Sequence, residues 1–283
     1  MPIAPVNGIR VNYEERGSGE PVLLVMGSGA SGRAWHLHQV PALVAAGYRV
    51  ITPDNRGIPP SEVSADPFTV HDMVADLVGL IEHLGIGACR LVGTSLGAYI
   101  VQELALARPD LVTQAVLIAT RARDDVFRTA LTRAEVELAE SGTRLPVRYQ
   151  AAIRAMRNLS RRTLEDDTTA RDWLDLFELS PQDGLGYLSH LALNPMPDRR
   201  AAYRAISTSC LVIGFDEDLV LPWRLGREVA DLIPGARFEL VEGCGHYGYL
   251  ENPMVVNRHI IDFFRSGKGS PMARAVVGGD EVG

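Results

Sequence analysis

A serine between two glycines is the first set of residues in the chain whose types and spacing could do chemistry. Residues 93–97 read Gly-Thr-Ser-Leu-Gly, with Ser95 at the centre. Glycines two positions away on either side relieve crowding around a serine held in a sharp turn from a strand into a helix. The first N–H groups of that helix would face an attacked carbonyl. A simple glycine-rich turn is the alternative, but the predicted strand before Ser95 and helix after it favour a nucleophile.

A histidine near the end of the chain could act as the base. Residues 243–246 read Gly-Cys-Gly-His and follow a predicted strand. A histidine on such a loop, at the carboxyl end of a strand, can reach into the mouth of a sheet. His246 is therefore the predicted base. The other six histidines lie on predicted helices or in a helical insertion, where we expect surface or capping roles: His36, His38, His71, His83, His190 and His259.

An acidic loop between these two motifs could supply the third member of a triad. Residues 214–222 read Gly-Phe-Asp-Glu-Asp-Leu-Val-Leu-Pro and offer three carboxylates. The acid would accept a hydrogen bond from the imidazole, fix its tautomer and stabilise the imidazolium. The order serine, acid, histidine along the chain is that of one class of serine hydrolase and differs from two others.

A glycine-rich loop follows the first apolar strand and could hold an oxyanion. Residues 26–32 read Met-Gly-Ser-Gly-Ala-Ser-Gly. Glycine lets backbone N–H groups approach a ligand closely, so the backbone N–H groups of Ser28 and Leu96 are the predicted donors. A phosphate-binding loop is the alternative, but no Gly-Lys-Ser/Thr follows, and the dinucleotide pattern is incomplete.

The elements that would position these loops alternate between strand and helix. Apolar runs and amphipathic spacing predict strands at 9–16, 21–26, 48–53, 90–93, 111–120, 209–215 and 236–242, and helices at 37–46, 70–84, 96–107, 224–232 and 253–266. The first strand alternates with period two, as a half-exposed antiparallel edge strand would. The rest predict an α/β fold with a mostly parallel central sheet flanked by helices.

A block without convincing strands interrupts this pattern. Helical segments are expected near 124–140, 145–164, 168–178 and 198–206. We therefore expect residues 1–120 and 207–266 to form one α/β core and residues 121–206 to be a helical insertion over one end of the sheet. Residues 267–283 lack periodicity and are expected to be a flexible tail.

Composition narrows the class of protein. The net charge of -7 over 283 residues argues against nucleic acid as a partner, because no basic surplus exists to neutralise phosphates. No apolar run is long enough to span a membrane, and no secretory leader is apparent. Three widely spaced cysteines fit neither a metal site nor a redox pair and suggest reduced thiols in a cytoplasm: Cys89, Cys210 and Cys244. No metal or cofactor is expected.

Together these motifs resemble the α/β-hydrolase superfamily over roughly residues 7–266. The resemblance is closest to a bacterial branch with cofactor-free (non-haem) haloperoxidases, esterases and thioesterases of antibiotic pathways. It rests on Gly27-Ser28, the Asp-Asn-Arg-Gly of residues 54–57, residues 93–97, the acidic loop and Gly245-His246.

The resemblance also implies which carboxylate is the acid. Family acid loops usually carry Asp four residues before a proline, as Asp218 stands before Pro222. They usually place that Asp three residues after a glycine, whereas here the interval is four. Asp218 is therefore the implied acid, and Asp216 is the reserve.

Two departures from the family pattern lie near the site. The usual His-Gly before the oxyanion residue is Met26-Gly27 here. The Arg-Gly-x-Gly-x-Ser segment reads Arg-Gly-Ile-Pro-Pro-Ser over residues 56–61. Neither removes a catalytic group, and Ser95 stands where related epoxide hydrolases and dehalogenases carry a nucleophilic Asp.

The resemblance implies a serine hydrolase or acyltransferase that acts through an acyl-enzyme on an ester, thioester or lactone. The substrate would be a medium-sized, largely apolar small molecule, free or bound to a carrier, in an antibiotic pathway. Halogenation with peroxide would be a side reaction through a peracid. A non-hydrolytic cyclase or lyase, or a ligand-binding protein, are the alternatives on the same fold.

Several side chains are expected to contact the substrate. Trp35 and Tyr247 are adjacent in sequence to the site loops. The insertion resembles the cap of the superfamily, and its apolar side chains could line a pocket above Ser95: Phe127, Leu174, Phe177 and Tyr187.

Overall fold

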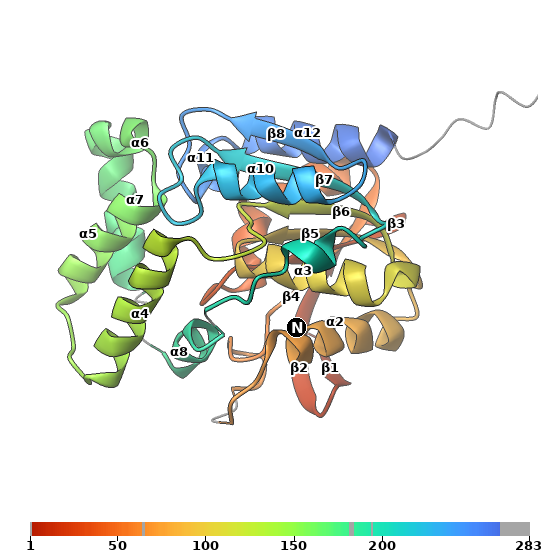
Figure 1. Ribbon diagram of the computed structural model, residues 1–283, viewed down its shortest axis with the longest axis horizontal. Helices are drawn as coiled ribbons and strands as arrows, with labels where there is room; N and C mark the ends of the chain where they lie inside the picture. The colour runs from red at the N-terminus through yellow and green to blue at the C-terminus, as the bar shows by residue number, and fades with distance from the viewer. Residues whose placement is uncertain (1, 64–65, 181–183, 194, 267–283) are drawn as a thin grey trace, which may run out of the picture.

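A single sheet runs through the centre of the molecule (Figure 1). The structure, a computed structural model, describes residues 2–63, 66–180, 184–193 and 195–266, so the expected tail at 267–283 lies outside the described residues. Within them, eight strands lie in the order β1-β2-β4-β3-β5-β6-β7-β8. Their bounds are β1 Ile3–Val6, β2 Ile9–Arg16, β3 Glu20–Val25, β4 Tyr48–Pro53, β5 Cys89–Thr94, β6 Val112–Ile118, β7 Ser209–Phe215 and β8 Arg237–Val241.

The sheet is parallel from β4 to β8, which confirms the predicted α/β fold class. β2 pairs antiparallel with β4 on one side and with β1 on the other, so β1 and not β2 is the edge strand. The sequence pattern did not predict β1. It has only four residues, and Pro5 within it removes one backbone donor, which is tolerated at a sheet edge.

Alternation along the buried strands divides the core into two layers. Leu23 and Val25 of β3 pack on one face with α2 Val70–His83, α3 Leu96–Ala107 and α10 Trp223–Leu232. Val22 and Leu24 pack on the other face with α1 Gln39–Ala45 and α12 Pro253–Ser266. Successive side chains of a strand point to opposite faces, which is why a continuous apolar run marks a strand buried on both sides.

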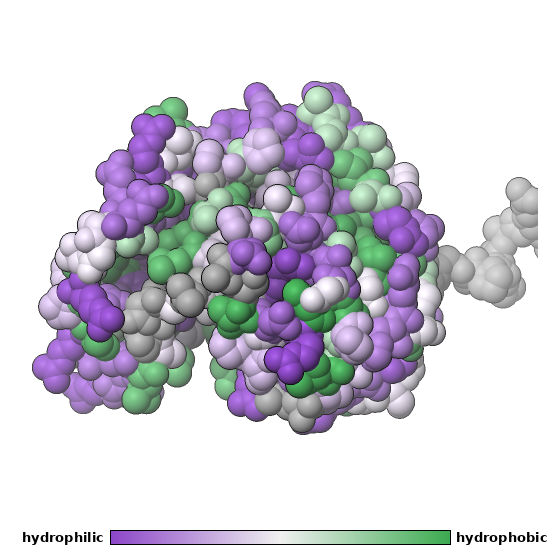
Figure 2. All heavy atoms as spheres, turned by 90° about the horizontal axis from the view of Figure 1, so that it is seen from below, coloured by the Kyte–Doolittle hydropathy of each residue, from purple (hydrophilic) through white to green (hydrophobic). Residues whose placement is uncertain are grey.

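Five helices between β6 and β7 form a separate lobe, green to teal at the left of Figure 1. We refer to them as the helical lobe: α4 Val126–Glu140, α5 Val147–Asn158, α6 Arg161–Glu165, α7 Asp167–Leu179 and α8 Leu185–Leu191. Ala151, Ala155, Leu159 and Phe177 form a small core of its own. Seen from below, a hollow separates the lobe from the sheet domain (Figure 2).

The lobe differs from the expected insertion in three details. The helix expected at 145–164 is divided into α5 and α6 at Ser160, whose hydroxyl accepts the Thr163 N–H and begins the second helix. α8 was not predicted from the pattern. The short helix α9 (Arg200–Tyr203), expected within the insertion, packs on α3 instead, where the Tyr203 hydroxyl donates to Glu103 at 2.9 Å.

The parallel pairing brings the site loops to one edge of the sheet. The loops after β3, β5, β7 and β8 all leave the carboxyl ends of parallel strands, as does the chain that enters the lobe after β6. Among the described residues, no helix has both the length and the apolar character that crossing a membrane requires.

Candidate active site

Ser95 occupies a sharp turn between β5 and α3. Its backbone has φ 54° and ψ -117°, a region that a residue with a side chain rarely adopts. The turn is fixed by the Ser95 N–H, which donates to the Ile118 carbonyl at 3.0 Å, and by the Tyr99 N–H, which donates to the Ser95 carbonyl at 3.1 Å. The strained turn presents the side chain of Ser95 at the carboxyl edge of the sheet.

The two glycines that flank Ser95 have a steric reason. A Cβ on Gly93 would overlap the carbonyl of Gly97, and a Cβ on Gly97 would overlap the carbonyl of Val25 in the neighbouring strand. The turn therefore closes only when both positions lack a side chain. Gly27 is crowded in the same way, since its Cβ would lie 3.2 Å from the Cβ of Ser95.

His246 and Asp218 form a buried pair on the loops after β8 and β7. His246 Nδ1 lies 2.8 Å from Asp218 Oδ2. The other carboxylate oxygen of Asp218 accepts the backbone N–H groups of Val220 and Leu221, each at 2.8 Å, which fixes the orientation of the carboxylate. Asp216, the reserve acid, is exposed and accepts the Cys244 N–H instead, at 3.2 Å. The structure thus brings Asp218, and not Asp216, to His246.

Glu251 ties the loop that carries His246 to the helical lobe. Its Oε2 accepts the Gly245 N–H at 2.7 Å. Its Oε1 accepts from the Ser160 N–H and hydroxyl, both at 2.8 Å, and from the Thr163 hydroxyl at 2.6 Å. A Cβ on Gly245 would lie 2.6 Å from the Asn158 carbonyl, so the glycine before His246 is required by this close approach of the lobe.

Asp54 and Asn55, the two residues directly after β4, hold the glycine loop of residues 26–32 in place by hydrogen bonds. Asp54 Oδ1 accepts from the Ser31 hydroxyl at 2.7 Å and from the Gly32 N–H at 2.8 Å. The Asn55 side chain donates to the Met26 carbonyl at 2.9 Å. These contacts give a structural role to the Asp-Asn pair of the family motif, which the sequence pattern alone did not assign.

His190 of α8 holds the same loop from the lobe. Its side chain is fully buried, which corrects the expected surface or capping role. Nδ1 accepts the Gly29 N–H at 3.1 Å, and Nε2 lies 2.8 Å from the Arg56 carbonyl. A carbonyl only accepts and an N–H only donates, so the ring is neutral with its proton on Nε2. Burial lowers the pKa of His190, opposed by the bond to Arg56.

Replacing His190 with glutamine is expected to remove part of the pH dependence of stability. His190 is harder to protonate in the folded protein than in the unfolded chain, where its pKa has the ordinary value of 6.5. The stability from the neutral ring is therefore complete above that pH and is lost as the pH falls through the lowered pKa. A glutamine amide could make both hydrogen bonds without titrating. Melting temperatures measured between about pH 7.5 and 5 should fall more for the wild type; parallel curves would contradict this role.

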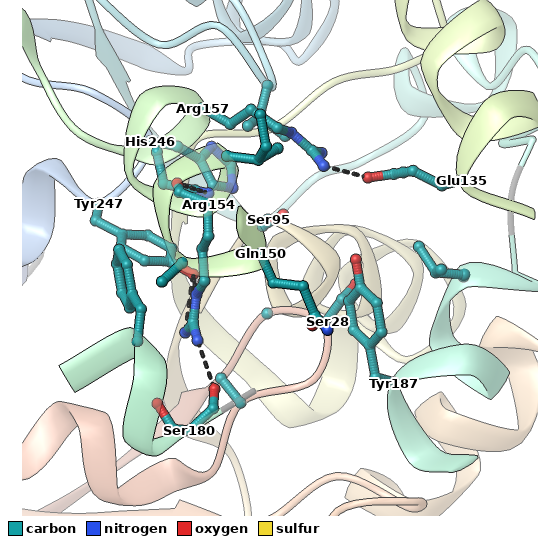
Figure 3. Close-up of a pocket in the computed structure, with 18 of the residues that line it drawn as sticks. Ser28, Ser95, Glu135, Gln150, Arg154, Arg157, Ser180, Tyr187, His246 and Tyr247 are labelled. Atoms are coloured by element: carbon teal, nitrogen blue, oxygen red, sulfur yellow. Dashed lines mark hydrogen bonds and ion pairs between the residues drawn. The ribbon is translucent and has the colours of Figure 1, made fainter. Parts of the chain in front are cut away.

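A cavity of about 1080 Å³ opens between the sheet edge and the helical lobe. Ser95, His246 and Ser28 line it, together with Tyr187 and Tyr247 (Figure 3). Ligand pockets commonly measure about 300–1000 Å³, so this cavity has room for a medium-sized molecule.

A second pocket, of about 20 Å³, adjoins the first beside Ser95. Ser28 and Leu96, whose backbone N–H groups are the predicted oxyanion donors, both line it. Its volume corresponds to roughly one water-sized group. A single oxygen atom bound to a tetrahedral carbon on Ser95 would fit there.

The structure divides the side chains that were expected to contact the substrate. Tyr247, Phe177 and Tyr187 line the large cavity. Trp35 does not: it is fully buried in the core, with its ring 5.0 Å from that of Tyr249, which corrects the prediction. The 3-10 turn Gly32–Leu37 directs Trp35 into the core, while Ala34 and Leu37 reach the cavity. Two lobe residues are also absent from its lining, namely Phe127, which is exposed, and Leu174, which packs within the lobe.

The three cysteines are free and buried. Burial raises the pKa of Cys89, Cys210 and Cys244 to about 12. A thiol with such a pKa is protonated at neutral pH and is a poor nucleophile. None of the three lines the cavity, whereas Ser95 does, together with His246.

Comparison with known proteins places the chain among enzymes. A family described as alpha/beta hydrolase fold matches residues 20–253. The Mycobacterium tuberculosis protein BpoC, named as a non-heme bromoperoxidase, is 47% identical over 261 residues, which are 92% of this chain and 99% of that protein. The crystal structure of BpoC from strain H37Rv has a TM-score of 0.88 at 46% identity, covering 91% of this chain and 96% of that one.

More distant structures carry names of hydrolytic enzymes. A thermophilic esterase from Thermogutta terrifontis has a TM-score of 0.78 at 27% identity, covering 92% of this chain and 94% of that one. An enol-lactonase from Burkholderia xenovorans LB400 has a TM-score of 0.77 at 26% identity, covering 93% and 100%.

Proposed function

Because this chain belongs to the α/β-hydrolase family and is an esterase-type enzyme, we propose that it cleaves or transfers an acyl group with Ser95 as the nucleophile, His246 as the base and Asp218 as the acid. The observation that carries the proposal is the buried Asp218–His246 pair, whose histidine lines the same cavity as Ser95 in its strained turn.

The proposed reaction has two halves. Asp218 holds the proton of the imidazole on Nδ1, so Nε2 is free to take the proton of Ser95 as its oxygen attacks the carbonyl carbon. The N–H groups of Ser28 and Leu96 bind the oxyanion in the small pocket beside Ser95. His246 then protonates the leaving group. In the second half, His246 takes a proton from water or another acceptor as that molecule attacks the acyl-enzyme, and then gives the proton to the departing Ser95 oxygen.

The names of two relatives support an ester or a lactone as the scissile group, and a thioester would react through the same acyl-enzyme. An esterase and an enol-lactonase share the fold at 27% and 26% identity, and the cavity suits a medium-sized acyl compound, as in secondary metabolism. The relation to BpoC also favours a side reaction. Hydrogen peroxide in place of water would release the acyl group as a peracid. That peracid would oxidise a halide to hypohalite and return the carboxylic acid.

The proposal is tested by treating the protein with a fluorophosphonate probe and measuring its intact mass. An activated serine attacks phosphorus and displaces fluoride, so we expect a single phosphonyl adduct on Ser95. The same probe on Ser95→Ala is the matched control and should leave its mass unchanged. An unlabelled wild type that is folded would favour a cyclase, a lyase or a ligand-binding protein on this fold.

A further inference from the structure

The large cavity is positively charged in a protein that is acidic as a whole. The chain carries 28 Lys and Arg against 35 Asp and Glu, a net charge of -7. Among the described residues, however, one carboxylate, Glu135, lines the cavity, and the arginines that line it are Arg33, Arg128, Arg144, Arg154 and Arg157. Of these, Arg33 is paired with Glu14 outside the lining. A cavity with this imbalance attracts anions against the sign of the whole molecule.

Two of these arginines share the single carboxylate. Arg157 Nη1 lies 2.5 Å from Glu135 Oε1, and a dashed line joins the two residues in Figure 3. Arg128 Nη1 lies 3.9 Å from Glu135 Oε2. The side chain of Arg128 is 9% exposed. The Nε atoms of both arginines are buried without a hydrogen-bond partner among the described residues. The two guanidinium groups thus carry one more positive charge than Glu135 neutralises.

The neighbouring charges do not offset it. Asp124 is engaged by Arg121, at 2.5 Å, in a buried ion pair. Arg154 is engaged elsewhere: it donates to the Ser180 carbonyl at 2.8 Å and lies 4.2 Å over the Phe177 ring. Burial first, and then the charge of Arg121, lower the pKa of Arg128, and the charges of Glu135 and Asp124 oppose them only in part. A buried cation with weak pairing is unfavourable unless an anion joins it.

We propose that Arg128 and Arg157 form a subsite for a carboxylate on the acyl part of the substrate. A guanidinium presents two parallel donors that match a carboxylate. Arg128 also lines the small pocket with Ser95 and Ser28, so the subsite lies beside the reacting carbonyl. The phosphates of an acyl carrier are many bonds from the thioester and would lie at the mouth of the cavity instead. This inference rests on the proposed acyl transfer and replaces the largely apolar substrate expected from the sequence.

The test compares the p-nitrophenyl monoester of glutaric acid with p-nitrophenyl valerate, a neutral ester of the same chain length. Wild type should show a kcat/KM about ten- to a hundredfold higher for the acidic ester, as a hydrogen-bonded charge pair implies. Arg128→Met should bring the ratio of the two kcat/KM values toward one, because the charges of Arg157 and Glu135 that remain neutralise each other. Arg128→Lys, which keeps the charge, should restore part of it.

Two further variants separate recognition from a merely structural role. Glu135→Gln removes the negative charge that offsets the arginines, so it should raise the ratio of kcat/KM for the acidic ester to that for the neutral ester. Damage to the fold would not raise this ratio. Arg133→Met is the matched control, because Arg133 is exposed on the same helix α4. It should keep the wild-type ratio. Thermal unfolding of each variant verifies that it is folded.

Several results would overturn the inference. The first is a wild type with equal kcat/KM for the acidic and the neutral ester. The second is an equal fall in kcat/KM for both esters in Arg128→Met, and the third is a lower ratio of the two kcat/KM values in Glu135→Gln. A fourth is that Arg128→Met loses kcat/KM on butyryl-coenzyme A but not on the matched N-acetylcysteamine thioester. In that case the anion that Arg128 binds belongs to the carrier and not to the acyl part. If no ester is cleaved, the proposed function fails first. Calorimetric binding of glutarate to wild type, and its loss in Arg128→Met, then tests the subsite by itself.

Discussion

Replacing Ser95 with alanine is expected to lower kcat on any ester by at least about four orders of magnitude. The substitution removes the oxygen that attacks the substrate and leaves His246 without a proton to accept. The cavity and both predicted oxyanion donors stay in place, so the substrate should still bind, with KM or Kd changed little. Steady-state kinetics with a p-nitrophenyl ester, together with equilibrium binding, measures both quantities.

A second substitution at the same position shows that the loss is chemical. Ser95 has a positive φ of 54°, which costs a residue with a Cβ about 1 kcal/mol or more. Ser95→Ala retains this strain and should unfold near the wild-type temperature. Ser95→Gly relieves it and should be more stable than Ser95→Ala by about 1 kcal/mol, with the same loss of turnover. A kcat near that of the wild type in either variant would contradict the assignment of Ser95 as the nucleophile.

Asp218→Asn is expected to lower kcat by about four orders of magnitude, with little change in the fold. The asparagine oxygen could still accept the N–H groups of Val220 and Leu221. Its NH₂ group would then face His246 Nδ1 and donate to it. The imidazole proton would move to Nε2, the atom that must be free to accept the proton of Ser95. Rates with a p-nitrophenyl ester measure the effect.

Asp216→Asn is the matched control for this substitution. Asp216 is two residues away, exposed, and accepts only the Cys244 N–H in the described structure. An asparagine oxygen can accept the same bond, so kcat should stay within about threefold of wild type. The reverse order of effects, with the larger loss at Asp216, would assign the acid to the reserve residue.

The sequence predicted the parts of the site that depend on local rules. Gly93 and Gly97 are needed because carbonyls close around the turn of Ser95, and such a steric need leaves a spacing that can be read. Gly245 is needed because the Asn158 carbonyl approaches it. β3 and β5, which lead into the glycine loop and the turn of Ser95, are buried on both faces, which is why their short strands could be predicted. β8, which leads to His246, is a partly exposed edge strand.

The parts that escaped prediction depend on which way a side chain points, or on contacts distant in sequence. Trp35 is adjacent to a site loop, but a single 3-10 turn directs it into the core. The contacts of His190 lie 161 and 134 residues away, at Gly29 and Arg56, and leave no spacing to recognise. Arg128 lies on a helix rich in charged residues, whose pattern is typical of a solvated surface.

The hydrogen bonds that attach the helical lobe at His190 and at Glu251 have a consequence for exchanging parts between relatives. At these two places His190, Ser160 and Thr163 contact backbone groups of Gly29 and Arg56 and the side chain of Glu251. Elsewhere the Arg161 N–H donates to the side chain of Glu217, and Arg224 pairs with Asp125 at the start of α4. Backbone groups are present in any homologue. A lobe transplanted from another family member would therefore need a histidine, a hydroxyl pair and an acid at the position of Asp125 to keep these side-chain contacts. Substrate range could then be altered as a module, without redesign of the sheet.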